Sequence, residues 1–134
     1  MTIFGIGVDV VENARIRQSI DRVGEPFLDR IFTKSERTYC DGMKFSERHY
    51  AARFAAKEAI SKAFGTGIGE NLHWHDMEIL RRESGEPFVV MSGRGKEFVR
   101  SKGIKQIMIS MTHTDHYSAA NAVVCCKEPS SSDA

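Results

Sequence analysis

The segment SERHYAARFAAKEAISKAF, residues 46–64, contains the longest helical pattern in the chain, and the other elements can be placed relative to it. Ser46 is the expected N-cap of a helix over about residues 47–64. Small and aromatic residues recur at the i, i+4 spacing of one helix face; they are Tyr50, Ala51, Phe54, Ala55, Ala59 and Ala63. The polar side carries Arg53, Lys57, Glu58, Ser61 and Lys62. The pattern predicts a long central helix with one apolar and one polar side.

Strand patterns lie on both sides of this helix. Residues 3–11 predict a strand in which one face is apolar and the other carries two glycines and a carboxylate. The apolar face holds Ile6, Val8 and Val10, and the other holds Gly5, Gly7 and Asp9. Glycine within a strand often marks the close approach of a ligand or of another backbone. Further strands are expected as a hairpin over 76–82 and 87–92 and as a second pair over 105–112 and 116–126.

Shorter helical patterns fill the intervals between these strands. They are residues 13–23 between Asn13 as N-cap and Gly24 as terminator, a short stretch after Pro26, residues 35–40 and residues 94–102. Paired antiparallel strands and grouped helices predict an α+β fold, with a mainly antiparallel sheet packed against the long central helix. We expect a single domain over residues 1–126 and a disordered tail over 127–134.

The composition favours a soluble cytoplasmic protein. With 134 residues and 41% hydrophobic residues, the chain can bury an adequate core. A net charge of +1 is not that of a polycation, so neither nucleic acid nor a membrane is an expected partner, and an acidic partner must be bound by a local patch. The three cysteines, Cys40, Cys125 and Cys126, are a poor disulfide framework and fit a reducing compartment. The sequence shows no signal-peptide pattern and no apolar run long enough to cross a membrane, so we expect no membrane anchor.

Several residues carry candidate chemistry, and each also has an ordinary structural interpretation. Asp9 stands among glycines, but a strand carboxylate opposite an apolar face is usually just exposed to solvent. Glu58 and Lys62, at i and i+4, form at least a favourable surface pair. The loop GTGIG at residues 65–69 lets backbone amides approach a phosphate, but glycine is also the usual helix terminator. The loop matches neither a P-loop nor a Rossmann fingerprint, because the lysine precedes it and it follows a helix.

The histidines are equally ambiguous when they are taken alone. His113, at the end of a predicted strand, is more typical of a structural residue near a turn. His73 and His75 alternate on one face, but no further His or Cys stands at a convincing zinc spacing, so zinc is not expected. No single motif in the chain identifies a reaction.

Together, four stretches resemble the holo-(acyl-carrier-protein) synthases of the 4′-phosphopantetheinyl transferase superfamily. They are GIGVDVVE at residues 5–12, FAAKEAISKAFGTG at residues 54–67, SMTH at residues 110–113 and YSAANA at residues 117–122. Arg15 also matches the family opening, and the resemblance is collinear over roughly residues 3–126. Thr112 departs from the serine often found in the family but keeps a hydroxyl. The resemblance implies the short, trimeric type of the family and its fold.

The resemblance implies a magnesium-dependent transfer that supports fatty acid biosynthesis. In that family a strand aspartate and a helix glutamate bind magnesium, and these are Asp9 and Glu58 here. Two carboxylates with substrate phosphates and waters suit Mg²⁺. A serine hydroxyl of the acyl carrier protein would attack the β-phosphate of coenzyme A, and 3′,5′-ADP would leave. Lys62 completes the implied catalytic set as a charge facing the phosphates, and the base is either Glu58 or a water on the metal.

The resemblance also implies binding residues for both substrates. For coenzyme A they are Arg53, Lys62, Gly65, Thr66, Gly67 and His113, with the loop amides cradling phosphate or ribose and His113 near the nucleotide. For the acidic carrier protein they are Arg15, Arg22, Lys44 and Arg48, with Arg17 as a further candidate. A solvated basic face is the alternative interpretation for Arg17 and Arg22.

We expect a homotrimer with active sites at the subunit interfaces, and the strand over 119–126, apolar on both faces, is compatible with it. Two other functions stay open. One is a different magnesium-dependent nucleotide or pyrophosphate enzyme on the same scaffold. The other is a trimeric module that binds coenzyme A or a nucleotide without turning it over.

Overall fold

The computed structural model describes residues 1–128, so most of the predicted tail, residues 129–134, lies outside the described part of the chain. The elements follow the expected order. For every element whose start and end are both predicted, each predicted end lies within one residue of the observed one. They are β1 (Thr2–Glu12), α1 (Asn13–Val23), α2 (Glu25–Ile31), α3 (Lys34–Asp41), α4 (Ser46–Phe64), the 3-10 turn η1 (Trp74–Asp76), β2 (Met77–Arg81), β3 (Pro87–Met91), α5 (Gly93–Ser101), β4 (Ile104–His113) and β5 (Tyr117–Cys126).

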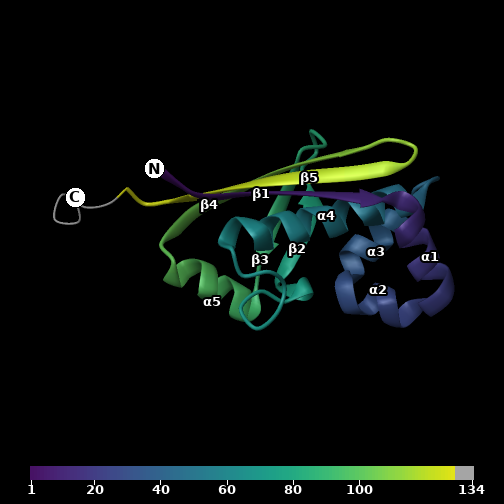
Figure 1. Ribbon diagram of the computed structural model, residues 1–134, viewed down its shortest axis with the longest axis horizontal. Coiled ribbons are helices and arrows are strands. Elements are labelled where there is room, and N and C mark those ends of the chain that lie inside the picture. The colour runs from purple at the N-terminus through teal and green to yellow at the C-terminus, as the bar shows by residue number, and fades with distance from the viewer. Residues whose placement is uncertain (129–134) are drawn as a thin grey trace.

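The strands form two antiparallel sheets, which confirms the predicted α+β class. β5 is the middle strand of a three-stranded sheet of order β1-β5-β4, and β2 and β3 form a separate hairpin. α4 crosses one face of the three-stranded sheet, and the other helices lie on that same side (Figure 1). α1, α2 and α3 gather where β1 ends, whereas α5 lies toward the other end (Figure 1).

The glycines of β1 face the backbone of α4. A Cβ at Gly5 would lie 2.0 Å from the carbonyl oxygen of Ala63, and a Cβ at Gly7 would lie 1.9 Å from that of Ala59. Side chains do not tolerate such distances, so only glycine lets the strand come this close to the helix. The close approach marked by these glycines is therefore that of another backbone, and it carries Asp9, on the same strand face, to the side of α4.

The apolar face of β1 is the one turned toward solvent. Ile6, Val8 and Val10 are 69%, 61% and 62% exposed. On the neighbouring strand, Ile6 pairs with Val123 and Val8 with Asn121, so the exposed surface continues across the sheet. An exposed sheet face that carries several large apolar side chains is typical of a protein–protein contact rather than of a free surface.

The prediction of a polar, solvent-facing side of α4 is wrong for Arg53, Lys57 and Ser61. Their exposed fractions are 1%, 0% and 0%. α2, α3 and η1 cover this side of the helix and supply hydrogen-bond partners to it. Of the five residues, only Glu58 and Lys62 reach the surface, with Glu58 partly buried. From Tyr50 to its end, α4 is therefore packed on nearly all sides, and Glu58 and Lys62 are the two polar residues of this stretch that reach the surface.

Two predicted helix caps have other roles. The residues in the N-cap position are Glu12 for α1 and Phe45 for α4, so Asn13 and Ser46 are the first helical residues. Asn13 Nδ2 donates to two carbonyls of the β4–β5 turn at 2.9 and 3.2 Å. Ser46 Oγ accepts a hydrogen bond from Arg17 Nη2 at 3.1 Å. Both side chains thus join separate elements, because long-range partners outcompete the local amides.

Candidate active site

A cleft of about 560 Å³ opens between β1, α1, α2 and α4. Its polar lining includes Asp9 from β1 and Glu58 and Lys62 from α4. Phe27 of α2 and Phe54 of α4 add aromatic lining. The fold therefore brings together the three residues to which the family resemblance assigns catalysis, although Asp9 and the helix pair are far apart in the chain.

The ammonium group of Lys62 contacts β1 through an ion pair and a backbone hydrogen bond. Its Nζ lies 2.8 Å from Asp9 Oδ1 and donates to the carbonyl of Val8 at 3.1 Å. The hydrogen bond that Lys62 donates to the Asp9 carboxylate raises the pKa of Lys62, so the ammonium stays charged at neutral pH. Within residues 1–128, the ion pair of Lys62 is with Asp9 rather than with Glu58, so the i, i+4 surface pair is not the one that forms. Lys62 thus links the helix signature to the glycine-flanked strand.

Glu58 occupies an unfavourable position for an ionised carboxyl group. Burial raises its pKa, the negative charge of Asp9 raises it further, and Lys62 offsets only part of this effect. Asp9 and Glu58 therefore face one cleft, which Glu12 and Arg15 also line, and the Lys62 ammonium group is paired with Asp9. Such a site attracts additional positive charge, because a cation near both oxygens relieves their repulsion.

The donor set of the cleft fits magnesium better than a transition metal. Mg²⁺ is usually held by one or two carboxylates together with substrate phosphates and waters. Asp9 and Glu58 offer the two carboxylates, and no group of three or more His, Cys, Asp or Glu residues that could hold a metal occurs in the described residues. A metal here would take its remaining ligands from the substrate and from solvent.

The backbone amides of Gly65, Thr66 and Gly67, in the loop after α4, are hydrogen-bonded within the chain. Gly65 N–H donates to the carbonyl of Lys62 at 3.0 Å, and the amides of Thr66 and Gly67 donate to that of Ser61 at 3.3 and 3.4 Å. Gly65 and Gly67 have φ values of 76° and 70°, which glycine adopts at helix ends. The amides predicted to cradle phosphate or ribose therefore donate to carbonyls of the last turn of α4 in this structure.

Arg53 and His113 lie outside the cleft. The Arg53 guanidinium stacks over the ring of Tyr39 at 4.3 Å, and its Nη1 donates to the carbonyl of His49 at 3.4 Å. The His113 ring lies 5.1 Å from the His49 ring. The two residues predicted to contact the nucleotide thus cluster around His49, apart from the carboxylates of the same chain.

The basic residues predicted to dock the carrier protein differ in availability. Arg15 lies at the cleft with its side chain 78% exposed, and its nearest acid is Glu12 at 4.0 Å. Arg22 and Lys44 are also exposed. Arg48 is only 20% exposed and pairs with Asp115 of the β4–β5 turn at 3.1 Å, and Arg17 pairs with Glu47 at 3.0 Å. The basic residues that are exposed for a carrier protein are therefore Arg15, Arg22 and Lys44, which are fewer than predicted.

Sequence reasoning missed the aromatic residues that line the cleft. Phe27, Phe54 and Tyr117 come from three different elements, and their helical or strand spacing is the same as that of ordinary core residues. The ring of Phe54 stacks on that of Trp74, with centroids 5.2 Å apart. Only the tertiary structure shows that these rings border the carboxylates.

Comparison with known proteins decides the family. A family model described as the 4′-phosphopantetheinyl transferase superfamily matches residues 5–123. The chain belongs to this superfamily. A curated holo-(acyl-carrier-protein) synthase of Ruminiclostridium cellulolyticum is 45% identical over 120 residues, covering 89% of this chain and 90% of that protein.

Solved structures agree with this transferase-superfamily assignment. The holo-(acyl-carrier-protein) synthase of Neisseria meningitidis has a TM-score of 0.86 at 30% identity, covering 92% of this chain and 98% of that one. The enzyme of Helicobacter pylori, solved in complex with coenzyme A, has a TM-score of 0.81 at 32% identity, covering 90% and 99%. The resemblance seen in the four sequence stretches is thus confirmed at the level of family and fold. Within residues 1–128 of this superfamily member, no helix is both long and apolar enough to span a membrane.

Proposed function

We propose that this phosphopantetheinyl transferase moves the 4′-phosphopantetheine arm of coenzyme A onto a serine of an apo acyl carrier protein and releases 3′,5′-ADP. The observation that carries the proposal is the convergence of Asp9, Glu58 and Lys62 on one cleft. Relatives with the same fold are named holo-(acyl-carrier-protein) synthases, and one was solved with coenzyme A. The role extends to fatty acid biosynthesis in the cytoplasm, where free thiols such as those of the three cysteines persist.

In the proposed reaction, the serine oxygen forms a bond to the β-phosphorus of coenzyme A while the bond to the departing 3′,5′-ADP breaks. Asp9 and Glu58 would hold Mg²⁺, which supplies neutralising charge at the diphosphate when it is bound. Lys62, anchored by Asp9, places a second positive charge beside the same oxygens. The Glu58 carboxylate, which lines the same cleft, is a candidate to accept the serine proton.

The nucleotide end of coenzyme A would bind across a subunit boundary. His113 is the side chain proposed for it, together with the loop that contains Thr66. Arg53 is 1% exposed and would act only through its contacts with Tyr39 and His49. Because His113 lies away from the carboxylates of its own chain, a neighbouring subunit would bring it to the cleft. The proposed trimer and the proposed coenzyme A site therefore depend on one another.

The reaction itself is tested by mass spectrometry of an apo acyl carrier protein after incubation with coenzyme A and Mg²⁺. The proposal predicts a gain of one phosphopantetheine on the carrier and release of 3′,5′-ADP. Hydrolysis of coenzyme A without a carrier adduct would favour a pyrophosphate enzyme instead. Binding of coenzyme A with no product under saturating Mg²⁺ would favour a binding module.

Arg15→Glu is expected to weaken docking of the carrier protein. The exposed guanidinium lies at the cleft, so reversing its charge replaces attraction to an acidic partner with repulsion. We expect KM for the carrier to rise about tenfold, and KM for coenzyme A to change much less. Steady-state kinetics with each substrate varied in turn checks this, with Arg94→Glu on the exposed face of α5 as the control. Equal effects of Arg15→Glu on the two KM values would contradict the docking role.

Ile6→Glu is expected to convert a trimer into monomers. Ile6 is 69% exposed in the single chain and lies on the uncovered apolar sheet face, so a carboxylate there costs little in a monomer and much in a buried interface. Analytical ultracentrifugation checks the oligomeric state, and Val90→Glu, at another exposed apolar position on β3, is the matched control. A monomeric wild-type protein, or a trimer that survives Ile6→Glu, would rule out this interface.

A further inference from the structure

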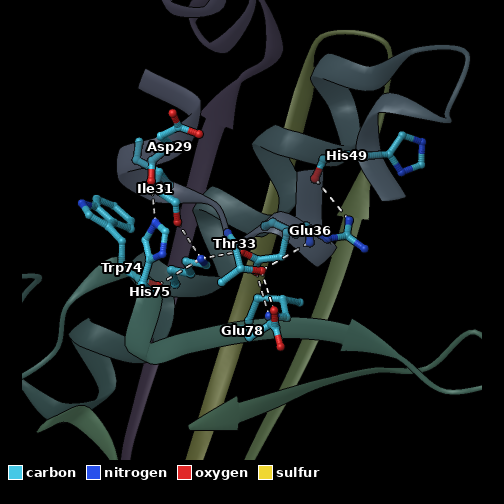
Figure 2. A network of polar contacts seen from close by, with 11 residues as sticks. Asp29, Ile31, Thr33, Glu36, His49, Trp74, His75 and Glu78 are labelled. Atoms are coloured by element: carbon cyan, nitrogen blue, oxygen red, sulfur yellow. Dashed lines mark hydrogen bonds and ion pairs between the residues drawn. The ribbon is translucent and has the colours of Figure 1, made fainter. Parts of the chain in front are cut away.

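A fully buried lysine lies on the side of α4 away from the sheet. Lys57 is 0% exposed, and its Nζ donates to the carbonyl of Ile31 at 2.7 Å, to Glu36 Oε1 at 2.7 Å and to the carbonyl of Trp74 at 3.1 Å. Figure 2 shows these acceptors arranged around one ammonium group. All three N–H bonds of the lysine are used, and none is directed to the cleft, so the proposed reaction does not explain this residue.

Its partner Glu36 is satisfied just as completely. Glu36 Oε1 accepts from the amide of Thr33 at 2.8 Å as well as from Lys57, and Oε2 accepts from the amide of Ile79 at 2.8 Å. The Thr33 hydroxyl in turn accepts from the amide of Glu36, which completes a capping box at the start of α3. One carboxylate therefore joins α3, α4 and β2 (Figure 2).

Two of the three acceptors of Lys57 belong to segments that line the cleft or pack against its lining. Ile31 ends α2, and the same helix contributes Phe27 to the cleft lining. Trp74 accepts through its carbonyl, while its ring stacks on Phe54, which also lines the cleft. Lys57 itself directly precedes Glu58 in α4. A single ammonium thus ties two aromatic parts of the cleft to the helix turn that carries the carboxylate.

Stability alone does not explain a pair of this kind. Well-packed apolar residues of similar volume often replace a buried ion pair with no loss of stability, because the desolvation cost is large. Directional hydrogen bonds differ from apolar contacts in that they fix rotation and register as well as distance. The three carbonyl and carboxylate acceptors therefore restrict how α4 can turn against α2 and η1.

We propose that the Lys57–Glu36 pair positions Glu58 and the side of the cleft that Phe27 and Phe54 line. The pair thereby sets the Mg²⁺ concentration that the site needs for transfer. This inference rests on the proposed role of Glu58. Partners that orient a metal-binding group typically change metal affinity or activity by about 10- to 100-fold when they are removed. The pair acts through other residues and touches neither substrate nor metal.

The test is the double variant Lys57→Met with Glu36→Gln, which removes both charges together and leaves no unpaired ion. The matched control is Lys96→Met with Glu97→Gln, an exposed adjacent pair on α5. Trp74 is the only tryptophan in the chain, so acrylamide quenching of its fluorescence reports on its stack with Phe54, which lines the cleft. Circular dichroism checks the fold, Mn²⁺ binding with coenzyme A present is followed by electron paramagnetic resonance, and transfer is measured over a range of Mg²⁺ concentrations.

The expected result is a folded double variant in which the Mg²⁺ concentration for half-maximal transfer and the Kd for Mn²⁺ rise about tenfold, while the control stays at wild-type values. Trp74 should be quenched more readily at the same temperature. A folded double variant with wild-type metal dependence would overturn the proposal. If the double variant does not fold, Glu36→Gln alone decides: wild-type metal dependence, or failure to fold, would show a purely structural pair.

The two proposals fail in different ways. If the wild-type protein transferred nothing to any carrier, the proposed function would be wrong, whereas Mn²⁺ binding and Trp74 quenching would still measure what the pair does to the cleft. If the wild-type protein transferred normally and the double variant did too, only the positioning role would be lost.

Discussion

Glu58→Gln is expected to lower the rate of transfer by about 10³-fold, the scale of losing one main electrostatic group of an active site. The amide cannot bind a divalent cation as a carboxylate does, and it cannot accept the serine proton. Because Glu58 sits at the cleft surface of α4 and makes no side-chain hydrogen bond in residues 1–128, the fold should stay intact. Single-turnover transfer to an apo carrier protein measures the loss, with Glu97→Gln on α5 as the control.

The same substitution should make the metal-free protein slightly more stable at neutral pH. Burial and the charge of Asp9 raise the pKa of Glu58, so its ionised form is disfavoured in the folded state. A raised folded-state pKa means that the relative stability is fully present below the unfolded pKa and is lost as the pH rises through the folded pKa. Thermal unfolding should therefore show Glu58→Gln above wild type at pH 7 and equal to it near pH 3. A variant that is less stable than wild type at pH 7 would contradict the raised pKa of Glu58. A variant that transfers at near wild-type rate would contradict the role of Glu58 in the reaction.

Gly7→Ala is expected to destabilise the protein by about 3 kcal/mol or more, at the upper end of overpacking effects. The new Cβ would lie 1.9 Å from the carbonyl oxygen of Ala59 and 2.8 Å from the amide nitrogen of Ala63, both of which are backbone atoms that cannot turn aside. β1 would have to move away from α4, and Asp9 would move with it. The metal dependence of transfer should therefore worsen along with stability.

Urea denaturation followed by circular dichroism measures this effect. The control is Gly69→Ala, because a Cβ at Gly69 meets nothing within 4 Å and the residue has no positive φ. We expect the control to unfold within a few tenths of a kcal/mol of wild type. Wild-type stability of Gly7→Ala would mean that the strand and the helix are not in backbone contact at this point.

Local periodicity predicted most of the fold. The alternation in β1, the two hairpin patterns and the long run from Ser46 to Phe64 have the periods of strands and helices, and those periods do not depend on distant partners. A local pattern does not show which face of a strand packs against the rest of the protein. In β1 the glycine face packs and the face with Ile6 and Val8 is exposed, because close backbone contact with α4 outweighs burial of the apolar side chains within one chain.

The interior of α4 was predicted wrongly for a related reason. A lysine, an arginine and a serine on one helix side normally indicate solvent, since burying a charge without partners is costly. Lys57 is buried because Glu36 and two carbonyls, all distant in sequence, use its three donors. Such long-range compensation cannot be read from the helix alone.

The candidate site shows the same division. The family resemblance selected Asp9, Glu58 and Lys62, and the structure places all three at one cleft. The loop amides looked available for phosphate because glycine permits close approach, but the end of α4 needs the same donors. The glycine pattern fits both uses equally, and only the hydrogen bonds of the folded chain distinguish them.

The most direct measurement is Mn²⁺ binding by electron paramagnetic resonance, as a spectroscopic substitute for Mg²⁺, in the presence of coenzyme A. The account predicts one Mn²⁺ per chain for the wild-type protein, and loss of that binding in both Asp9→Asn and Glu58→Gln. Binding should depend on coenzyme A, since the diphosphate completes the ligands. Unchanged Mn²⁺ stoichiometry and affinity in either variant would show that these two carboxylates do not share one cation.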